Sequence, residues 1–291
     1  MFERADDILI EGIDQRRPFH VLEFYWKGFQ PRLVWRGQRD DRESEEPVDR
    51  ADISVGRARR CVGRFERGRH IPCPNEVHVE GHSQCEACAG ESYIWDQECV
   101  FDPKCDGSSC LSPRSGGAPS EFCRREHMLY LAFYQDRPKI GMSSSKRIRE
   151  RLVEQGADAF AFIGTYPNRR AARLAEMEIS SSTGLPQWHR QQDILDMLSR
   201  PVDRSAVEAE HGRLESLLEG REGVSFGDLE FLDGYPLPQP LQGAPRLQGT
   251  EGVHRGRFVG VKGKWLVYES RGLRALSMPD LVARFVDRPG Q

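Results

Sequence analysis

The sequence has no apolar run that approaches the length of a membrane-spanning helix. Its first residues, Met1 to Asp7, also lack the basic start and the apolar core of a secretory signal. The net charge is small, at −3, and the 30% charged and 38% hydrophobic residues are ordinary for a soluble protein. We therefore expect a cytoplasmic protein with no membrane partner, and 291 residues allow two or three domains.

Cysteine is absent from most of the chain, because all eight cysteines lie between Cys61 and Cys123. In a reducing compartment, cysteines serve as metal ligands more often than they form disulfides. The first four end in a C-x2-C pair, Cys85 and Cys88, through which two thiolates can bind one metal ion. Four thiolates suit tetrahedral Zn²⁺. Alternative ligands for this set are His70, His78 and His82.

The other four cysteines lie in a polar, loop-rich segment with too few apolar residues to form a core. Such a segment needs a cross-link to stabilise its fold, which a metal ion provides. Disulfides, an iron–sulfur cluster and reduced thiols are the alternatives. We predict two structural zinc sites without an open coordination position, the first formed by Cys61, Cys73, Cys85 and Cys88 and the second by Cys99, Cys105, Cys110 and Cys123.

The chain from residue 127 to residue 179 has the pattern of a small ββαβα unit. The stretch Leu129 to Phe133 shows the period-2 alternation of a half-buried strand. A turn at residues 135–138 leads into a short second strand at Lys139 to Gly141, and residues 158–166 form an apolar, aromatic third strand.

Two helices complete this unit. Ser143 to Ser145 offer N-cap hydroxyls to the first helix, and Gly156 ends it. In the second helix the apolar residues Leu174, Ala175 and Ile179 recur at helical spacing. The unit is basic, with nine Lys or Arg against three acidic residues from position 137 to position 173. A second basic segment has six arginines against one glutamate from position 57 to position 69, so we expect a directed nucleic-acid face.

The order of these elements, with these residues, resembles the GIY-YIG nuclease domain. Met128-Leu129-Tyr130 stands where the motif has GIY, and Lys139-Ile140-Gly141 stands where it has YIG. Lys139 thus replaces the second motif tyrosine, as in some branches of the superfamily. An arginine follows on the first helix, at Arg149 or Arg151, and a glutamate on the second helix, at Glu176 or less well at Glu178.

The resemblance implies a role for each matching residue. In that family the tyrosine lies near the attacking water, the arginine supports the phosphate and the glutamate holds one divalent metal ion. These roles fall on Tyr130, Arg151 (or Arg149) and Glu176, and Gly141 is a residue of the binding site. A guanidinium and Mg²⁺ or Mn²⁺ neutralise the charge that develops in phosphodiester cleavage. A tyrosine acts as a general base only with help, because its unperturbed pKa is about 10.

A second resemblance covers roughly residues 59–190. The runs RRCVG, HIPCPN, QCEACAG, ECVFDPKC, FCRREHMLYLAF, RLVEQGA and LAEMEI are similar to an uncharacterised prokaryotic family listed only as a domain of unknown function, family 2797. This family pairs a cysteine-rich N-terminal sequence with a GIY-YIG-like core. Its pattern favours Arg151 over Arg149, has the glutamate at Glu176 and has a histidine matching His127.

His127 precedes the first strand of this unit and has several candidate roles. It can donate to a phosphate, act as a base beside Tyr130, or bind the second metal ion after Cys123. Capping of the incoming strand is the structural alternative.

The rest of the chain shows no catalytic motif. We expect strands at residues 18–26 and 31–36, helices at 191–198 and 207–218, a Pro/Gly-rich linker or strap at 234–249, and a hairpin that turns at Lys262-Gly263-Lys264. Its strands can complete a small barrel with the N-terminal ones. The predicted domains are an N-terminal β segment (1–52), a double zinc module (53–124), a GIY-YIG-like domain (125–198), a helical segment with a linker (199–245) and a C-terminal β unit (246–291).

We therefore predict an α+β protein with a metal-dependent nucleic-acid phosphodiesterase activity. In this prediction Tyr130, with His127, positions water, Arg151 supports the phosphate, and Glu176 binds Mg²⁺ or Mn²⁺. The alternatives are a zinc-stabilised nucleic-acid-binding protein that does not cut, which Lys139 favours, and a scaffold for protein partners. The sequence does not distinguish DNA from RNA or define an oligomeric state.

Overall fold

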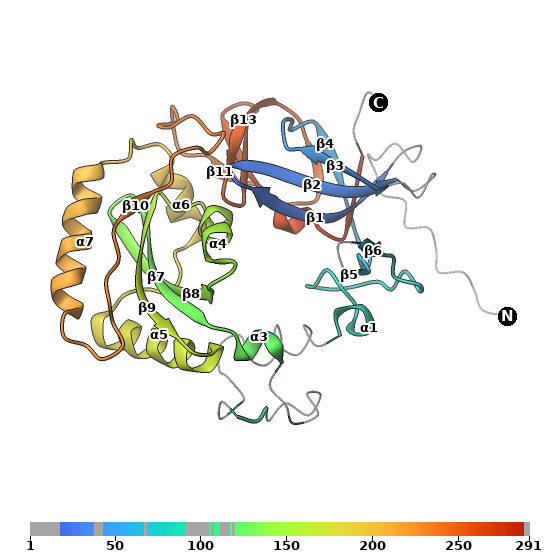
Figure 1. The fold of residues 1–291 in the computed structure, drawn as a ribbon. Helices are drawn as coiled ribbons and strands as arrows, with labels where there is room; N and C mark the ends of the chain where they lie inside the picture. The colour runs from blue at the N-terminus through green and yellow to red at the C-terminus, as the bar shows by residue number, and fades with distance from the viewer. Residues whose placement is uncertain are drawn as a thin grey trace.

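The computed structural model describes residues 18–37, 43–66, 69–90, 105, 108–110, 117 and 120–287. The described chain is a mixed helix and strand structure with two main bodies, a β unit and a ββαβα unit, which lie side by side (Figure 1). A short cysteine-rich segment lies beneath the β unit in this view.

The β unit is made from both ends of the chain. One sheet has six strands in the order β12-β4-β16-β1-β2-β3, and the second has four in the order β11-β15-β14-β13. The N-terminal and C-terminal strands, which the sequence analysis placed in separate segments, thus share one sheet. The strands are β1 (Phe19–Lys27), β2 (Gln30–Gly37), β3 (Glu43–Pro47), β4 (Ile53–Arg59), β11 (Arg246–Leu247), β12 (Gly252–His254), β13 (Arg257–Lys262), β14 (Trp265–Glu269), β15 (Leu273–Ser277) and β16 (Arg284–Asp287).

The predicted strands and hairpins of this unit are confirmed. β1 and β2 pair as an antiparallel hairpin, and β13 and β14 pair across the predicted turn, with Lys262 opposite Trp265. The two sheets enclose an apolar core to which both ends of the chain contribute, including Val21, Trp26, Leu33, Leu266, Leu276 and Val286. The 3-10 helix η2 (Pro279–Leu281) adds Leu281 to this core.

The ββαβα unit has the predicted element order. Its antiparallel sheet has the order β10-β9-β7-β8, so β7 lies in the middle and β8 at an edge. Its elements are β7 (His127–Tyr134), β8 (Arg137–Ser144), α4 (Ile148–Gln155), β9 (Ala159–Tyr166), α5 (Arg169–Thr183), α6 (Gln191–Met197), α7 (Arg204–Leu218) and β10 (Glu230–Phe231).

The alternation of β7 places its side chains on two different faces of the sheet. Leu129, Leu131 and Phe133 pack in a core with residues of α5 and α7. Tyr130 and Tyr134 face the opposite way, toward α4 and α6. Figure 1 shows these two pairs of helices on opposite sides of the sheet, with α4 and α6 on the side of the β unit.

The predicted serine cap of the first helix is wrong. Ser143 and Ser144 do not cap α4, because β8 continues to Ser144 and the N-cap residue is Arg147, which makes no side-chain cap bond. The exposed faces of α5 and α7 carry Leu174 and Leu217, which are 43% and 44% exposed. The predicted helix stop is confirmed, because Gly156 caps α4 in the left-handed conformation at a φ of 77°.

Polar contacts and a shared core join the two bodies. Val153 of α4 packs in the core of the β unit. The buried Lys262 ammonium forms an ion pair with Asp158 and donates to Gln239 Oε1 at 2.7 Å. Residues 234–249 form a packed strap, in which the N–H of Leu241 donates to Leu198 O at 2.9 Å. The relative position of the two bodies is therefore well defined.

The cysteine-rich segment contains β5 (Arg64–Glu66), β6 (Arg69–Ile71), α1 (Glu86–Ala89) and, next to β7, the short helix α3 (Glu121–Arg124). The part that follows β4 packs on the β unit through Val62 and Val79, which form a small core with Leu22 and Ala283.

Candidate functional site

Tyr130 lies at the centre of the candidate site, on the middle strand β7. Its neighbour across the sheet is Gly141 of β8. A methyl group at position 141 would lie 2.5 Å from the Tyr130 hydroxyl oxygen and 2.6 Å from ring carbon Cζ, so only glycine leaves room for the ring. Gln155, the last residue of α4, donates a hydrogen bond of 2.7 Å from Nε2 to this hydroxyl. The ring is thus held between two strands and a helix end.

The Tyr130 phenol is deeply buried. Burial raises its pKa, although the hydrogen bond from Gln155 and the positive charge of Arg151 act in the opposite direction. At neutral pH this residue is therefore a neutral phenol, able to donate and to accept hydrogen bonds.

The structure separates the two candidate arginines of α4. Arg151 interacts with Tyr130 and pairs with Glu154 at 3.6 Å, and its side chain is 53% exposed. Arg149 points elsewhere, because it makes a two-bond ion pair with Glu230 at 2.8 Å for each bond and lies over the Phe160 ring. Arg151 is therefore the helix arginine at the Tyr130 site.

Lys139 and Glu176 reach the same site from β8 and α5. Lys139 is on the Tyr130 face of the sheet, opposite Ala132. Burial, together with the charge of Arg151, lowers the pKa of Lys139 to about 8, while Glu176 acts against this shift. Among the described residues Lys139 has no hydrogen-bond or ion-pair partner. Its ammonium group is free to bind an anion.

Glu176 is buried, at 5% exposure, and is surrounded by cations. Its Oε2 accepts a hydrogen bond of 2.5 Å from Arg173, which also donates to Gln187 Oε1 at 2.8 Å. Burial raises the pKa of Glu176, and Arg173, Lys139 and Arg169 oppose this rise. One carboxylate among several cations leaves a surplus of positive charge, which favours the binding of an anion such as phosphate.

His127 lies apart from this group. It belongs to the other face of β7, with Leu129, and is fully buried. Its Nδ1 is 2.8 Å from Arg125 O and its ring packs edge-on against Phe122, while its Nε2 is buried and has no hydrogen-bond partner among the residues that the structure describes. Burial lowers the pKa of His127. The structure thus brings Tyr130, Lys139, Gly141, Arg151 and Glu176 together and leaves His127 and Arg149 outside.

Several residues of this site were not singled out from the sequence. Gln155 and Arg173 hold the tyrosine and the glutamate, and Lys264 of the β13–β14 turn contributes positive charge near Lys139. His189 stacks edge-on against Tyr134 at 5.4 Å, near Lys139. A helix-end glutamine and a lysine in a hairpin turn give no sequence signal of their own, because only the packing of the two bodies brings them here.

A second candidate site is the cluster of Cys61, Cys73, Cys85 and Cys88. Their sulfur atoms all lie within 4.8 Å of one another, and Cys73 Sγ is 4.0 Å from Cys85 Sγ. A tetrahedral zinc with bonds of about 2.3 Å has ligand sulfurs about 3.8 Å apart. The four cysteines can therefore hold a metal ion such as zinc.

The surroundings of this cluster fit a thiolate-bound metal. The N–H groups of Gly63 and Cys85 donate to Cys61 Sγ at 3.4 and 3.1 Å. Burial raises the pKa of the Cys73 thiol, but backbone hydrogen bonds from Val77 and Asn75 outweigh it and bring the pKa to about 7. His70 is not a ligand here, because its ring nitrogens lie 2.6 Å from Glu43 Oε1 and 2.5 Å from Val62 O.

The second predicted zinc set is covered only in part. Cys99 lies outside the described residues. Cys105 and Cys110 face each other in an isolated antiparallel bridge, and Cys123 lies in α3. Within the described part of the chain these three cysteines do not join a group of metal ligands, and a second zinc site stays a prediction.

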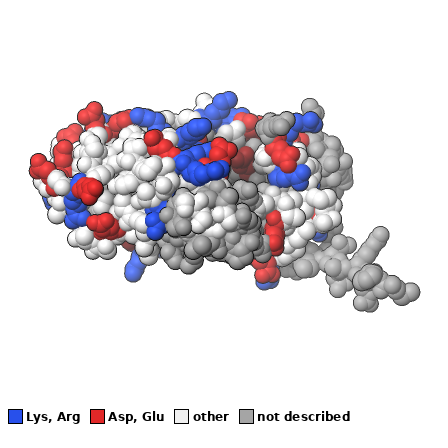
Figure 2. Space-filling view, turned by 60° about the horizontal axis from the view of Figure 1, so that its bottom comes forward, with Lys and Arg blue, Asp and Glu red and all other residues white. Residues whose placement is uncertain are grey.

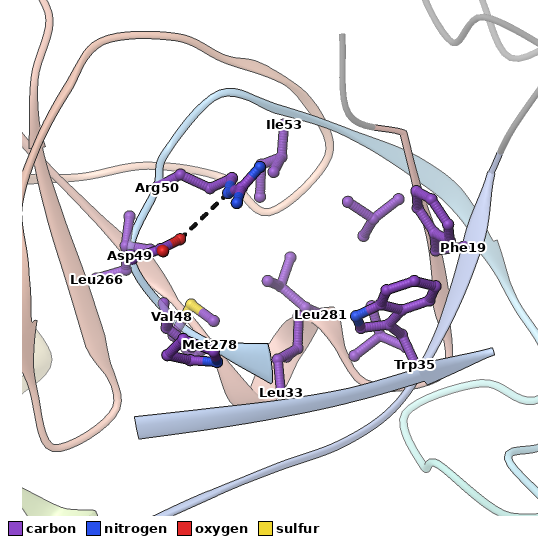
Figure 3. Close-up of a pocket in the computed structure, with 13 residues that line it drawn as sticks. Phe19, Leu33, Trp35, Val48, Asp49, Arg50, Ile53, Leu266, Met278 and Leu281 are labelled. Atoms are coloured by element: carbon purple, nitrogen blue, oxygen red, sulfur yellow. Dashed lines mark hydrogen bonds and ion pairs between the residues drawn. The ribbon is translucent and has the colours of Figure 1, made fainter. Parts of the chain in front are cut away.

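Two cavities lie in or near the β unit. The first, of about 30 Å³, is lined mainly by apolar side chains such as Phe19, Leu33 and Trp35 (Figure 3). It has room for about one water molecule and is a packing gap in the core. The second, of about 290 Å³, is polar and borders the cysteine cluster. Its lining includes Arg36 and Arg60, each with a guanidinium nitrogen 3.9 Å from Glu76.

The face drawn in Figure 2 shows basic and acidic side chains interspersed, with no continuous basic surface. Exposed ion pairs also occur in the described part of the chain, such as that of Arg213 with Glu210 at 2.7 Å.

A mixed helix and strand fold with a cysteine cluster able to bind metal defines the class of this protein. More particularly, the chain belongs to the family described as Protein of unknown function (DUF2797), whose model matches residues 50–279. The predicted membership of this family is confirmed, and the match extends beyond residues 59–190 to include most C-terminal strands. No curated protein and no solved structure matches the chain.

None of the helices in the described ranges is both long enough and apolar enough to span a membrane.

Proposed function

We propose that this protein is a metal-dependent nucleic-acid phosphodiesterase with a GIY-YIG-like core and a structural zinc ion at the four-cysteine cluster. One observation carries the proposal. Tyr130, Lys139, Arg151 and Glu176 come from four different elements, yet the charges of Arg151 and Glu176 act on both Tyr130 and Lys139, and Gly141 lies against the Tyr130 ring. The resemblance to GIY-YIG nucleases assigns Tyr130, Arg151 and Glu176 to catalysis, and Lys139 stands in the place of the second motif tyrosine.

The cations of the site suit a phosphodiester. Lys139 and Arg151 offer an ammonium and a guanidinium to phosphate oxygens, on which negative charge increases in the transition state. Arg151 is half exposed and so can reach a ligand, whereas the Lys139 ammonium has no partner among the described residues. Because both cations repel each other in the free protein, binding of an anion stabilises the site.

Tyr130 is suited to position the attacking water. Its hydroxyl is oriented by Gln155, and its ring packs against Gly141 of β8, where only glycine leaves room for it. Since burial keeps the phenol neutral, its oxygen acts as a hydrogen-bond partner of the water, and deprotonation requires the cations nearby.

The residues of the site offer few protein ligands to a divalent metal ion. Glu176 is its one carboxylate among the described catalytic candidates, and Arg173 already pairs with it at 2.5 Å. Mg²⁺ commonly keeps several waters and takes one or two carboxylates together with substrate phosphates. Glu176 would therefore hold Mg²⁺ or Mn²⁺ together with the bound phosphate, and the ion would neutralise charge on the leaving oxygen.

A second candidate function is nucleic-acid binding without cleavage. The observation that favours it is the same ion pair, because a carboxylate neutralised by Arg173 has less charge to offer a metal ion. The two functions share their anion-binding cations and differ in the need for Glu176.

The test is a cleavage and binding assay with labelled single- and double-stranded DNA and RNA, in Mg²⁺, Mn²⁺ or EDTA. The variant Glu176→Gln removes the buried carboxylate charge, and Glu178→Gln removes an exposed charge from the same helix as the matched control. The proposed enzyme cuts, stops in EDTA, loses activity with Glu176→Gln and keeps it with Glu178→Gln. Binding without cutting by all three proteins identifies the second function, and neither binding nor cutting contradicts both.

A further inference from the structure

The turn between β13 and β14 lies directly against the C-terminal end of α4. A methyl group on Gly263 would be 2.6 Å from the backbone nitrogen of Gly156, and one on Gly156 would be 3.1 Å from Gly263 Cα. Both glycines have positive φ values, of 56° and 77°. This backbone contact requires glycine at both positions, and it brings the β unit next to Gln155, the residue that holds Tyr130.

The turn is anchored on both sides. Trp26 of β1 donates a hydrogen bond of 2.9 Å from Nε1 to Gly263 O. Lys262, on the other side, forms the buried ion pair with Asp158. Lys264, the next residue of the turn, therefore has a defined place relative to α4 and the Tyr130 site.

The local contact of the Lys264 ammonium is with an aromatic ring. Among the described residues its ammonium makes no hydrogen bond or ion pair, and it lies 4.6 Å from the centroid of the Trp265 ring. It is close enough to Lys139 and Arg151 for their charges to act on one another. Burial also lowers the pKa of Lys264. Three cations from β8, α4 and the β13–β14 turn thus converge, and the carboxylates of Glu176, Glu154 and Asp280 act on Lys139, Arg151 and Lys264, respectively.

We propose that Lys264 binds a backbone phosphate of the nucleic acid beside the phosphate held by Lys139 and Arg151. The bound strand then passes from the ββαβα unit onto the β13–β14 turn, and the β unit is part of the substrate-binding surface. The ligand is a polyanion with at least two phosphates, since a single phosphodiester occupies only the Lys139–Arg151 position. This inference rests on the proposed function only in taking nucleic acid as the ligand.

The experiment measures the affinity of the full chain for a labelled 20-nucleotide DNA and RNA as a function of salt concentration. Each phosphate contact contributes about one unit to the slope of log affinity against log salt. Lys264→Ala is expected to reduce the slope by about one, and Lys264→Arg to keep it. Arg257→Ala is the matched control, because Arg257 is at the far end of the same hairpin and pairs with Glu269. The slope for Arg257→Ala is expected to equal that of the native protein.

A second variant tests the position of Lys264 and leaves its charge unchanged. Gly263→Ala keeps Lys264 but forces the turn away from Gly156, so it is expected to weaken binding like Lys264→Ala. Thermal unfolding of each variant checks that the fold is retained.

Cleavage is recorded in the same samples, which separates this inference from the proposed function. A native protein that binds without cutting, with a reduced slope for Lys264→Ala, supports the Lys264 contact and contradicts the phosphodiesterase. A native protein that cuts, with an unchanged slope for Lys264→Ala, contradicts the Lys264 contact and leaves the phosphodiesterase. Absence of any nucleic-acid binding contradicts both.

Discussion

Gln155 Nε2 lies 2.7 Å from the hydroxyl oxygen of Tyr130 and joins the end of α4 to the middle strand of the sheet. The other polar atom of this amide, Oε1, is buried and has no hydrogen-bond partner within the described part of the chain. Gln155 therefore keeps one unsatisfied polar atom in order to hold the phenol, which is the kind of arrangement that occurs at functional sites.

This relationship predicts a coupled loss of stability. Gln155→Leu leaves the buried Tyr130 hydroxyl without its donor and is expected to lower the free energy of unfolding by about 1–3 kcal/mol. Tyr130→Phe removes the other partner, so the double variant should lose less than the sum of the single ones. Chemical denaturation of the native protein, the two single variants and the double variant measures these free energies of unfolding. Additivity within about 0.5 kcal/mol would show that the two side chains do not interact.

Gly141 is expected to be intolerant of a side chain. Gly141→Ala places a methyl group 2.5 Å from the Tyr130 hydroxyl, and overpacking of this kind costs about 1–3 kcal/mol. Gly212, inside α7, has no atom within 4 Å of an added methyl, so Gly212→Ala should stabilise by about 0.5–1 kcal/mol. Shifts of the same sign in thermal unfolding would contradict this account of Gly141.

Nucleic-acid affinity is expected to fall from pH 7 to pH 9, because the pKa of Lys139 is lowered to about 8. Below that pH the ammonium is charged and binds phosphate, and above it the charge is lost. Lys139→Arg keeps its charge across this range and should flatten the profile. Fluorescence anisotropy at constant ionic strength measures it, and parallel profiles for the two proteins would exclude Lys139 as the titrating group.

The titration of Lys139 also affects the stability of the fold, which rises over a pH range in which nucleic-acid affinity falls. Its pKa is lowered from 10.5 in folding, so between about pH 8 and 10.5 the unfolded chain binds more protons at this residue than the folded one. The destabilising contribution of Lys139 is therefore present below pH 8 and disappears as the pH rises toward 10.5.

The four-cysteine cluster predicts that replacing one of its cysteines lowers the zinc content of the protein by one ion. Cys88→Ser removes one of the four thiolates and is expected to lose the zinc of this cluster and to lower the unfolding temperature, because structural zinc contributes to folding. Elemental analysis counts the ions. Cys110→Ser reports on the second predicted set and should leave the first ion bound. Equal zinc in the native protein and Cys88→Ser would rule out the cluster as a zinc site.

The sequence predicts the elements of this protein better than their assembly. Alternation, turn residues and Gly156 were sufficient for β7, β9, α4 and the β13–β14 hairpin. The pairing of the N-terminal and C-terminal strands depends on contacts more than 200 residues apart in the chain, such as that of Phe19 with Val286. Local patterns carry no information about such pairing.

The site was predictable to a similar extent. Motif positions indicated Tyr130, Gly141 and Glu176. Both Arg149 and Arg151 matched the first resemblance, and the second favoured Arg151. The structure separates them by the rotation of α4 relative to the sheet, which turns Arg149 toward Glu230. His127 was grouped with Tyr130 because it directly precedes the predicted strand. In the structure it is the first residue of β7, and the strand alternation places it on the opposite face.

The two arginines of α4 provide the most direct test of the central claim. The proposed site acts on a phosphodiester through Tyr130, Lys139, Arg151 and Glu176. Arg151→Ala should therefore reduce nucleic-acid cleavage by about 100-fold or more, since it removes a charge that stabilises the transition state. Arg149→Ala removes an equal charge from the same helix, but its guanidinium is paired with Glu230, and cleavage should stay within about twofold of the native rate. Equal rates for the two variants, or a larger loss for Arg149→Ala, would contradict the account.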